Sequence, residues 1–94
     1  MPKQASFLAL VHGYVQGVNF RYFVIKRAES LGLKGYVRNL PDGAAVEVRA
    51  EGDKDKLEEL LKQLSIGPSR ARVKRVDVEW SDYTGRFEDF EVNY

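Results

Sequence analysis

The hydrophobic pattern along the chain changes its period several times, and each change marks a predicted element. Residues 6–12 are mostly apolar at consecutive positions, which is typical of a strand buried on both faces in the middle of a sheet. Residues 20–31 carry apolar side chains at three- and four-residue spacing, as one face of a helix does. We expect Asn19 to be the N-cap of this helix and Gly32 to lie just past its end. The predicted inner face consists of Phe20, Phe23, Val24, Ala28 and Leu31.

A hairpin is predicted next. Residues 34–39 and 45–50 have the short length and alternating pattern of strands, and in the second strand Val46, Val48 and Ala50 would face inward. Leu-Pro-Asp-Gly between the two strands favours a turn.

The remaining elements are a second helix and two strands. Leucines at helical spacing follow Asp53, which we expect to cap this helix. The inner face of the helix would be formed by Leu57, Leu60, Leu61 and Leu64. Residues 72–80 alternate as a strand does, with Val76, Val78 and Trp80 on one face, and residues 90–94 form a last short strand.

This order of elements predicts an α+β fold. Strand, helix, strand, strand, helix and strand, with a short C-terminal strand added, is the ferredoxin-like split βαβ sandwich, with two helices on one face of an antiparallel sheet. We expect residues 1–94 to form a single domain, in which residues 1–5 are a loose N-terminal tail. Because many functions occur on this fold, the fold alone does not indicate one.

The composition excludes several kinds of chemistry. There is no cysteine and only one histidine, His12, so a zinc–cysteine site or a Ser-His-Asp triad is not expected. The net charge of +1 gives no broad positive field for nucleic acid or membranes. The first residues lack the apolar core of a signal peptide, which predicts a cytoplasmic protein. High charge with few Met and no Cys weakly suggests a heat-adapted, thermostable protein.

One loop carries candidate chemistry. Residues 11–21 read V-H-G-Y-V-Q-G-V-N-F-R, so two glycines join a strand to a helix with Arg21 in its first turn. Glycines allow a close approach to backbone N–H groups, the helix N-terminus attracts anions, and Arg matches two phosphate oxygens. The loop is therefore a candidate site for one phosphoryl group. The alternative is that the glycines only form a turn and that Arg21 is solvated.

Two long motifs resemble signatures of the acylphosphatase family. V-x-G-x-V-Q-G-V-x-F-R at 11–21 matches the first signature, and G-Y-V-R-N-L-P-D-G at 35–43 resembles the second. Gly-Pro at 67–68, Ala-Arg-Val at 71–73 and Phe-Glu-Val at 90–92 are also similar to the family, so the resemblance covers residues 6–94. One departure follows Gly43, where two alanines stand in place of the usual single residue. We expect this extra residue to move the turn rather than the site.

The resemblance implies an enzyme that hydrolyses the carboxyl–phosphate bond of acyl phosphates. By the same resemblance Arg21 and Asn39 are the catalytic residues, with Arg21 holding the phosphoryl group and Asn39 orienting the attacking water. Backbone N–H groups of the preceding loop would help to bind the phosphoryl group. The expected phosphate-binding residues are Tyr14, Val15, Gln16, Gly17, Val18, Asn19, Phe20 and Arg21.

The resemblance also implies what the enzyme works with. The expected ligands are a small acyl phosphate as substrate and inorganic phosphate as product and inhibitor. No metal, other cofactor, nucleic acid or membrane is expected to take part, and the expected state is a monomer. Acetyl, carbamoyl and glyceroyl phosphates share the reacting end, so the motifs do not distinguish between them.

The alternative function is a non-catalytic ferredoxin-like module that binds an anion or RNA. RNA binding on this fold uses a basic sheet face with stacked aromatic rings, whereas residues 44–51 contain no aromatic and two acids. The lone His12 is expected to be a hydrogen-bonded structural residue. The acidic residues near the second helix are expected to be solvated rather than to bind a cation. These are Glu47, Glu51, Asp53 and Asp55.

Overall fold

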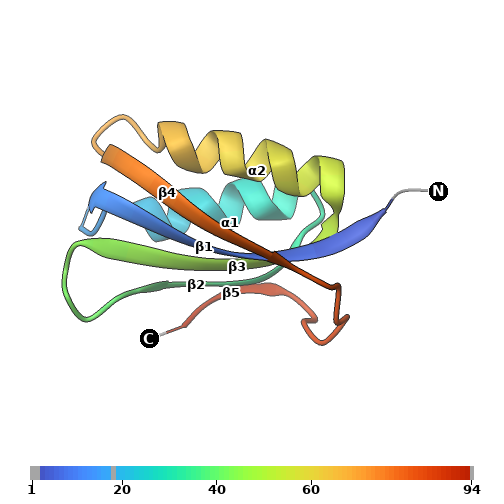
Figure 1. Cartoon of the computed structure of the whole chain (residues 1–94). Helices are drawn as coiled ribbons and strands as arrows, with labels where there is room; N and C mark the ends of the chain where they lie inside the picture. Colours follow the sequence, from blue (N-terminus) through green and yellow to red (C-terminus); the bar gives the residue numbers. More distant parts are fainter. Residues whose placement is uncertain (1–2, 18, 94) are drawn as a thin grey trace.

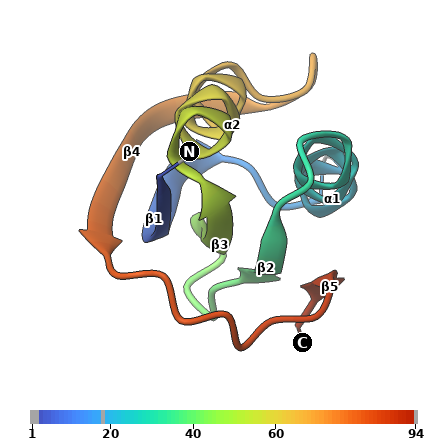
Figure 2. The same ribbon diagram turned by 90° about the vertical axis from the view of Figure 1, so that its right-hand side faces the viewer.

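A computed structural model of the chain describes residues 3–17 and 19–93, in which two helices cover one face of a five-stranded sheet (Figures 1 and 2). The strand order is β4-β1-β3-β2-β5, and β5 is parallel to β2 while the other neighbours are antiparallel. The predicted ferredoxin-like sandwich is therefore confirmed. The elements are β1 (Gln4–Tyr14), α1 (Phe20–Ser30), β2 (Lys34–Asn39), β3 (Ala45–Asp53), α2 (Lys54–Ile66), β4 (Arg72–Ser81) and β5 (Phe90–Val92).

Strand β1 lies inside the sheet, between β3 and β4, as its apolar sequence predicts. Its helix-facing residues Phe7, Ala9 and Val11 are fully buried. Leu8 and Leu10 point to the other face and are only half-buried, so the prediction of burial on both faces is only partly correct. Both helices of the described residues lie on the opposite face (Figure 2).

The N-terminal tail is shorter than predicted. Strand β1 begins at Gln4, so Gln4 and Ala5, which we expected in a loose tail, belong to the sheet and pair with β3. The carbonyl oxygen of Lys3 accepts a hydrogen bond of 2.8 Å from the N–H of Lys54, which ties this end of the chain to α2. Residues 1 and 2 lie outside the described part of the chain.

Helix α1 ends as the sequence predicts. Gly32 has φ of 71°, and its N–H donates to the carbonyl oxygen of Glu29, while the N–H of Leu33 donates to that of Ala28. This pair of bonds is a Schellman motif, which needs a residue with positive φ at the position of Gly32. The chain can therefore turn from α1 directly into β2.

The beginning of each helix differs from the prediction. Asn19 and Asp53 occupy the expected N-cap positions, but neither side chain makes a capping hydrogen bond. Asn19 has φ of 61° and ψ of 25°, whereas a capping side chain normally belongs to a residue with extended backbone. The backbone conformation of Asn19 is thus set by the loop before α1 rather than by capping.

The hairpin between β2 and β3 takes up the extra alanine in its turn. Asn39 is the last residue of β2 and pairs with Val46. The N–H of Leu40 donates to the carbonyl oxygen of Ala45 at 3.0 Å, and the N–H of Ala44 donates to Oδ1 of Asp42 at 2.9 Å. Asn39 therefore stands at the strand end, with the added residue beyond it.

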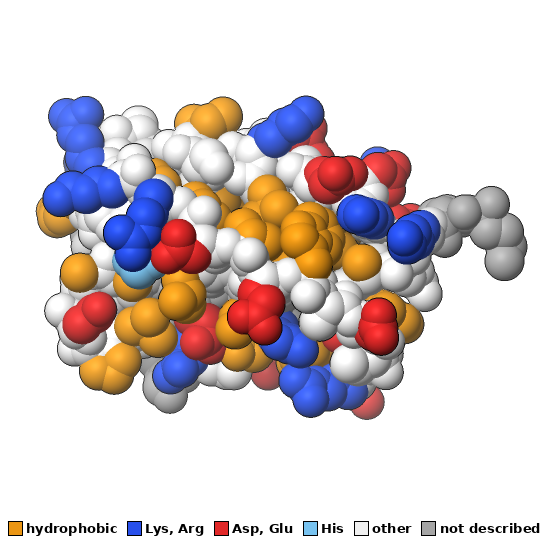
Figure 3. All heavy atoms as spheres, in the orientation of Figure 1, with side chains coloured by type: hydrophobic (Ala, Val, Ile, Leu, Met, Phe, Trp, Pro, Cys, Tyr) orange, Lys and Arg blue, Asp and Glu red, His pale blue; other side chains and the backbone are white. Residues whose placement is uncertain are grey.

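The edge strand β4 is the most exposed strand of the sheet. Val78 and Trp80 remain more than a third exposed. In the orientation of Figure 1, hydrophobic side chains lie in the middle of the visible face of the molecule, with charged groups around them (Figure 3). The Trp80 ring packs edge-on against Phe7, with the ring centroids 5.7 Å apart, and Lys54 lies over its face. Alternating charged residues on an edge strand discourage pairing with another chain.

Two polar pairs lie on the sheet face that the helices leave open. His12 Nε2 is 3.0 Å from Oδ2 of Asp77, so His12 is hydrogen-bonded, as expected. Arg38 donates to both carboxylate oxygens of Glu47, and these hydrogen bonds lower the pKa of the Glu47 carboxyl. Arg38 thus faces away from the helices, on the same side of the sheet as Glu47.

The expectation for Glu51 is wrong. Its side chain is 1% exposed, whereas we expected a solvated carboxylate. Its carboxylate accepts hydrogen bonds from the hydroxyl of Thr84 at 2.7 Å and from the N–H groups of Thr84 and Gly85. The segment between β4 and β5 crosses the open face of the sheet there (Figure 2), and no periodic pattern in the sequence places it.

Candidate active site

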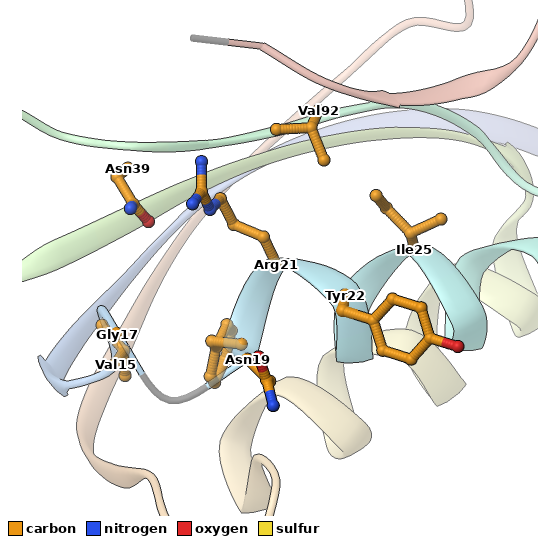
Figure 4. A pocket seen from close by; sticks show the side chains of 9 residues that line it. Val15, Gly17, Asn19, Arg21, Tyr22, Ile25, Asn39 and Val92 are labelled. Atoms are coloured by element: carbon orange, nitrogen blue, oxygen red, sulfur yellow. The ribbon is translucent and has the colours of Figure 1, made fainter.

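A pocket of about 330 Å³ opens where the N-terminus of α1 meets the end of β2. The residues that line it are Val15, Gly17, Asn19, Phe20, Arg21, Tyr22, Ile25, Asn39 and Val92. Figure 4 shows side chains from α1, β2 and β5 around this space. The pocket therefore brings together the two signature segments, which are separated in the sequence by α1 and most of β2.

The loop between residues 14 and 20, here called the 14–20 loop, leaves β1 through an irregularity in the sheet. The pairing of β1 with β4 shifts between His12 and Gly13. Gly13 has φ of 134°, and a Cβ atom there would collide with the carbonyl oxygen of Arg72. Only glycine fits so close to the neighbouring backbone, and such bulges redirect a strand near functional sites.

Three hydrogen bonds tie this part of the chain to the β2–β3 hairpin, two from the 14–20 loop and one from Gly13 at the end of β1. The side-chain amide of Gln16 donates to the carbonyl oxygens of Leu40, at 2.9 Å, and Ala45, at 2.8 Å. The N–H of Gly13 donates to the carbonyl oxygen of Ala44 at 3.1 Å. Since Asn39 immediately precedes Leu40, these bonds fix the loop relative to Asn39.

The described residues of the loop that line the pocket include two with unusual backbone conformation. Gly17 has φ of 74° and Asn19 has φ of 61°, so both lie in the left-handed region. Asn is among the few non-glycine residues that adopt this region readily, and such conformations concentrate at functional sites. The first hydrogen bond of α1 runs from the N–H of Phe23 to the carbonyl oxygen of Asn19. The positive end of the helix dipole therefore lies at the pocket.

Arg21 and Asn39 approach the pocket from two different elements. Arg21 stands in the first turn of α1 and is half-buried, and Asn39 closes β2. Figure 4 shows the guanidinium of Arg21 and the amide of Asn39 directed toward the same space. The Oδ1 atom of Asn39 is buried without a hydrogen-bond partner, which is unusual for a polar atom and suits a group that binds a ligand or water.

The predicted phosphate-binding residues are placed differently around this space. Gly17, Asn19 and Arg21 line the pocket, and Val15 and Phe20 line it while their side chains are also part of the hydrophobic core. Gln16 is directed to the hairpin turn, and Tyr14 is 61% exposed and does not line the pocket. Val18 lies outside the described residues.

Three lining residues were not predicted from the sequence. Tyr22, Ile25 and Val92 form an apolar part of the pocket beyond Arg21 (Figure 4). Ile25 and Val92 also pack against the core. A helical wheel would have placed Tyr22 and Ile25 one turn apart on the side of α1 next to Arg21, but it could not show that β5 brings Val92 there.

The charge of the pocket suits an anion. Arg21 is the only charged side chain among the described residues that line it. A cation, amide groups and a helix N-terminus favour a phosphate group rather than a metal ion. Elsewhere in the described part of the chain, no three His, Cys, Asp or Glu side chains gather in a way that could hold a metal ion.

Comparisons with known proteins agree with the signature motifs. The family model described as acylphosphatase matches residues 7–92. An acylphosphatase of Dehalococcoides mccartyi is 52% identical over 86 residues, which cover 92% of this chain and 94% of that protein. An acylphosphatase of Deinococcus radiodurans is 56% identical over 77 residues, covering 82% and 87% of the two chains.

A solved structure gives the same result for the fold. The crystal structure of acylphosphatase from Bacillus subtilis superposes with a TM-score of 0.91 at 33% sequence identity. The match covers 96% of this chain and 99% of the other. Neither helix in the described residues is long and apolar enough to cross a membrane.

Proposed function

The chain belongs to the acylphosphatase family and is an enzyme that hydrolyses acyl phosphates, and on this premise we propose how its pocket performs the reaction. Arg21 and backbone N–H groups of the 14–20 loop hold the phosphoryl group, and Asn39 orients the attacking water. The observation that carries this proposal is the meeting of Arg21 and Asn39 at one pocket. The alternative of a non-catalytic binding module is not favoured by this family membership.

In the proposed reaction, water attacks phosphorus. A bond forms between the water oxygen and phosphorus, and the bond between phosphorus and the acyl oxygen breaks, with its electron pair leaving on the carboxylate. An oxygen of the substrate's own phosphoryl group takes up a proton of the water. The products are the carboxylate and inorganic phosphate, so the reaction needs no other reactant.

Few protein groups are required for this chemistry. The carboxylate leaving group is stable at neutral pH and needs no general acid. Phosphoryl transfer depends mainly on positioning and on stabilising the charge of three equatorial oxygens. The planar guanidinium of Arg21 matches two of these oxygens, and the amide of Asn39 can align a water on the opposite side from the leaving group.

The supporting argument for Asn39 is its unpartnered oxygen. A buried acceptor left unpaired costs about 1–3 kcal/mol, so a group that stays in this state is expected to gain a partner during function. A water that donates to Oδ1 of Asn39 would have its lone pairs directed away from the amide. Such a water would be ready to attack a phosphoryl group held by Arg21.

The position of bond cleavage tests this proposal. Acetyl phosphate is hydrolysed in ¹⁸O-labelled water with excess chelator, and both products are analysed by mass spectrometry. Attack at phosphorus places the label in phosphate, and the rate is expected to survive the chelator. Label in acetate, or activity that is lost with chelator and restored by magnesium or zinc, would overturn the proposed metal-free mechanism.

Four further properties belong to the proposal. Inorganic phosphate is expected to compete with the substrate for the pocket, because it has the shape and charge of the transferred group. The cytoplasmic location and the monomeric state stay predictions from the sequence. The same holds for thermostability, which rests on the composition alone.

A further inference from the structure

The pocket has two chemically different ends. Asn39 and Gly17 lie on one side of the Arg21 side chain, and Tyr22, Ile25 and Val92 lie on the other (Figure 4). The first end offers an amide and backbone groups. The second offers an aromatic ring and two branched aliphatic side chains, with no charged residue among its described lining.

The geometry of phosphoryl transfer decides which end receives the acyl group. The attacking and leaving oxygens lie roughly in line on opposite sides of phosphorus. If Asn39 holds the water, the acyl group must leave on the side away from Asn39. That side is the one formed by Tyr22, Ile25 and Val92.

We propose that Tyr22, Ile25 and Val92 form an acyl subsite, and that this enzyme prefers acyl phosphates with an apolar chain or ring. This inference rests on the proposed roles of Arg21 and Asn39. Contact with the subsite removes apolar surface of the substrate from water, which favours each added methylene group. A carbamoyl or glyceroyl group would place polar atoms against the side chains of Ile25 and Val92, which offer no hydrogen-bond partners.

The burial of the three residues fits a preformed binding surface. Ile25 and Val92 are half-buried and pack against the hydrophobic core, so their positions are fixed before substrate arrives. Tyr22 is 64% exposed, which is high for a tyrosine and leaves its ring available to a ligand. The ammonium of Lys26 lies over this ring, 5.8 Å from its centroid, and is exposed to water.

The test uses a homologous series of substrates. Acetyl, propionyl and butyryl phosphates release carboxylates of nearly equal basicity, so their intrinsic reactivity is similar and only the apolar chain grows. The expected result is a rise in kcat/KM of about two- to fourfold for each added methylene, the size expected for partial burial of that group. A flat or falling series would overturn the acyl subsite.

Variants show whether the preference for longer acyl chains comes from the subsite or from another part of the protein. In Tyr22→Ser combined with Val92→Thr, the ratio of kcat/KM for butyryl to acetyl phosphate should fall toward one, because only Ile25 of the three subsite residues is left. Tyr83→Ser is the matched control, because Tyr83 is also a largely exposed tyrosine, at 44%, but does not line the pocket. The control should keep the wild-type ratio. A double variant that keeps this ratio would also overturn the proposal.

The outcome is distinguishable from failure of the reaction mechanism itself. A wrong mechanism would place the ¹⁸O label in the carboxylate product whatever the chain length. A wrong subsite would leave the label in phosphate and abolish only the dependence on chain length. If the double variant unfolds, as judged by circular dichroism, Tyr22→Ser alone replaces it and should lower the ratio at least twofold. An unchanged ratio there would count against the subsite.

Discussion

At the scale of single residues, Asn39 could be named from the sequence only through the family resemblance, whereas the loop itself already made Arg21 a candidate for binding a phosphoryl group. Without the resemblance, a solvated Arg21 would remain an open alternative, and Asn39 would be a turn residue before Leu-Pro-Asp-Gly. The structure adds a property that no motif contains, which is the buried and unpartnered Oδ1 of Asn39. Burial depends on long-range packing, so local patterns cannot reveal it.

Replacement of Arg21 by lysine should keep the fold and weaken the enzyme severely. Lysine supplies a charge but not the planar pair of donors that fits two phosphate oxygens. We expect kcat/KM to fall by roughly the 2.7–4 kcal/mol typical of losing one transition-state donor, which is about 100- to 1000-fold. Phosphate inhibition should weaken as well. Both are measured by steady-state kinetics with acetyl phosphate.

The control for this substitution lies on the same helix. Arg27 is exposed and packs over the ring of Phe23, outside the pocket, so Arg27→Lys makes the same chemical change there. It should leave kcat/KM within about twofold of wild type. Near-normal kinetics of Arg21→Lys would contradict the proposed phosphate contact.

At the scale of elements, the periodic patterns predicted the helices and strands, and the contacts between elements were not predictable. The hydrophobic spacing within a segment reflects that segment's own secondary structure, so it located α1, α2 and the five strands well. Gln16 was expected to contribute only its backbone N–H group to phosphate binding. Its bonds to Leu40 and Ala45 join two loops, and no local rule predicts such a contact.

The tether formed by Gln16 should be sensitive to charge. In Gln16→Glu a carboxylate would face the carbonyl oxygens of Leu40 and Ala45, where the amide now donates both hydrogen bonds. Two lost bonds of about 1 kcal/mol each, with added repulsion, should move the loop relative to Asn39. We expect kcat/KM at pH 7.5 to fall at least about 10-fold, because a small misplacement of reacting groups is costly.

The pH dependence identifies the cause of this loss. Below the pKa of the introduced acid, the protonated carboxyl can donate one hydrogen bond again, so part of the activity should return near pH 5 relative to wild type. Gln16→Met, which lacks any donor, should show no such recovery. Gln4→Glu, at the exposed far end of β1, serves as the control for added charge. A pH profile of Gln16→Glu parallel to wild type would contradict the tether.

At the scale of the whole molecule, the open sheet face is the region that the sequence described least well. Glu51 was expected in water, and it instead holds the segment between β4 and β5 through Thr84 and Gly85. That segment has neither helical nor strand periodicity, so its path depends on contacts far apart in the chain. The two-layer core, by contrast, follows from the apolar faces of α1, α2 and the strands.

Glu51 should make the stability of the fold depend on acid. Burial raises the pKa of its carboxyl, but the hydrogen bonds from Thr84 and Gly85 outweigh this and lower the folded-state pKa below the usual value. The charged group therefore stabilises the fold above the unfolded pKa of about 4.3. This contribution should be lost as pH falls through the lower folded-state pKa.

The substitution Glu51→Gln measures that contribution. It should lower the free energy of unfolding by about 1.5–3 kcal/mol at pH 7, the usual range for hydrogen bonds to a charged group. It should also flatten the loss of stability between neutral pH and pH 3, relative to wild type, in urea unfolding experiments. Glu59→Gln, on the exposed side of α2, should change neither quantity by more than about 0.5 kcal/mol. Equal acid sensitivity of Glu51→Gln and wild type would refute this role.

The most direct test of the catalytic account is the kinetic behaviour of Asn39→Ala. We predict a fall in kcat of about 100-fold or more, while KM and the inhibition constant for phosphate stay within about twofold, because Asn39 contacts the water and not the phosphoryl group. Asn93→Ala is the matched control, because Asn93 is exposed and does not line the pocket, and it should keep wild-type kinetics. If Asn39→Ala folds normally and retains near-full kcat, or if it loses phosphate binding in parallel with kcat, Asn39 does not orient the water.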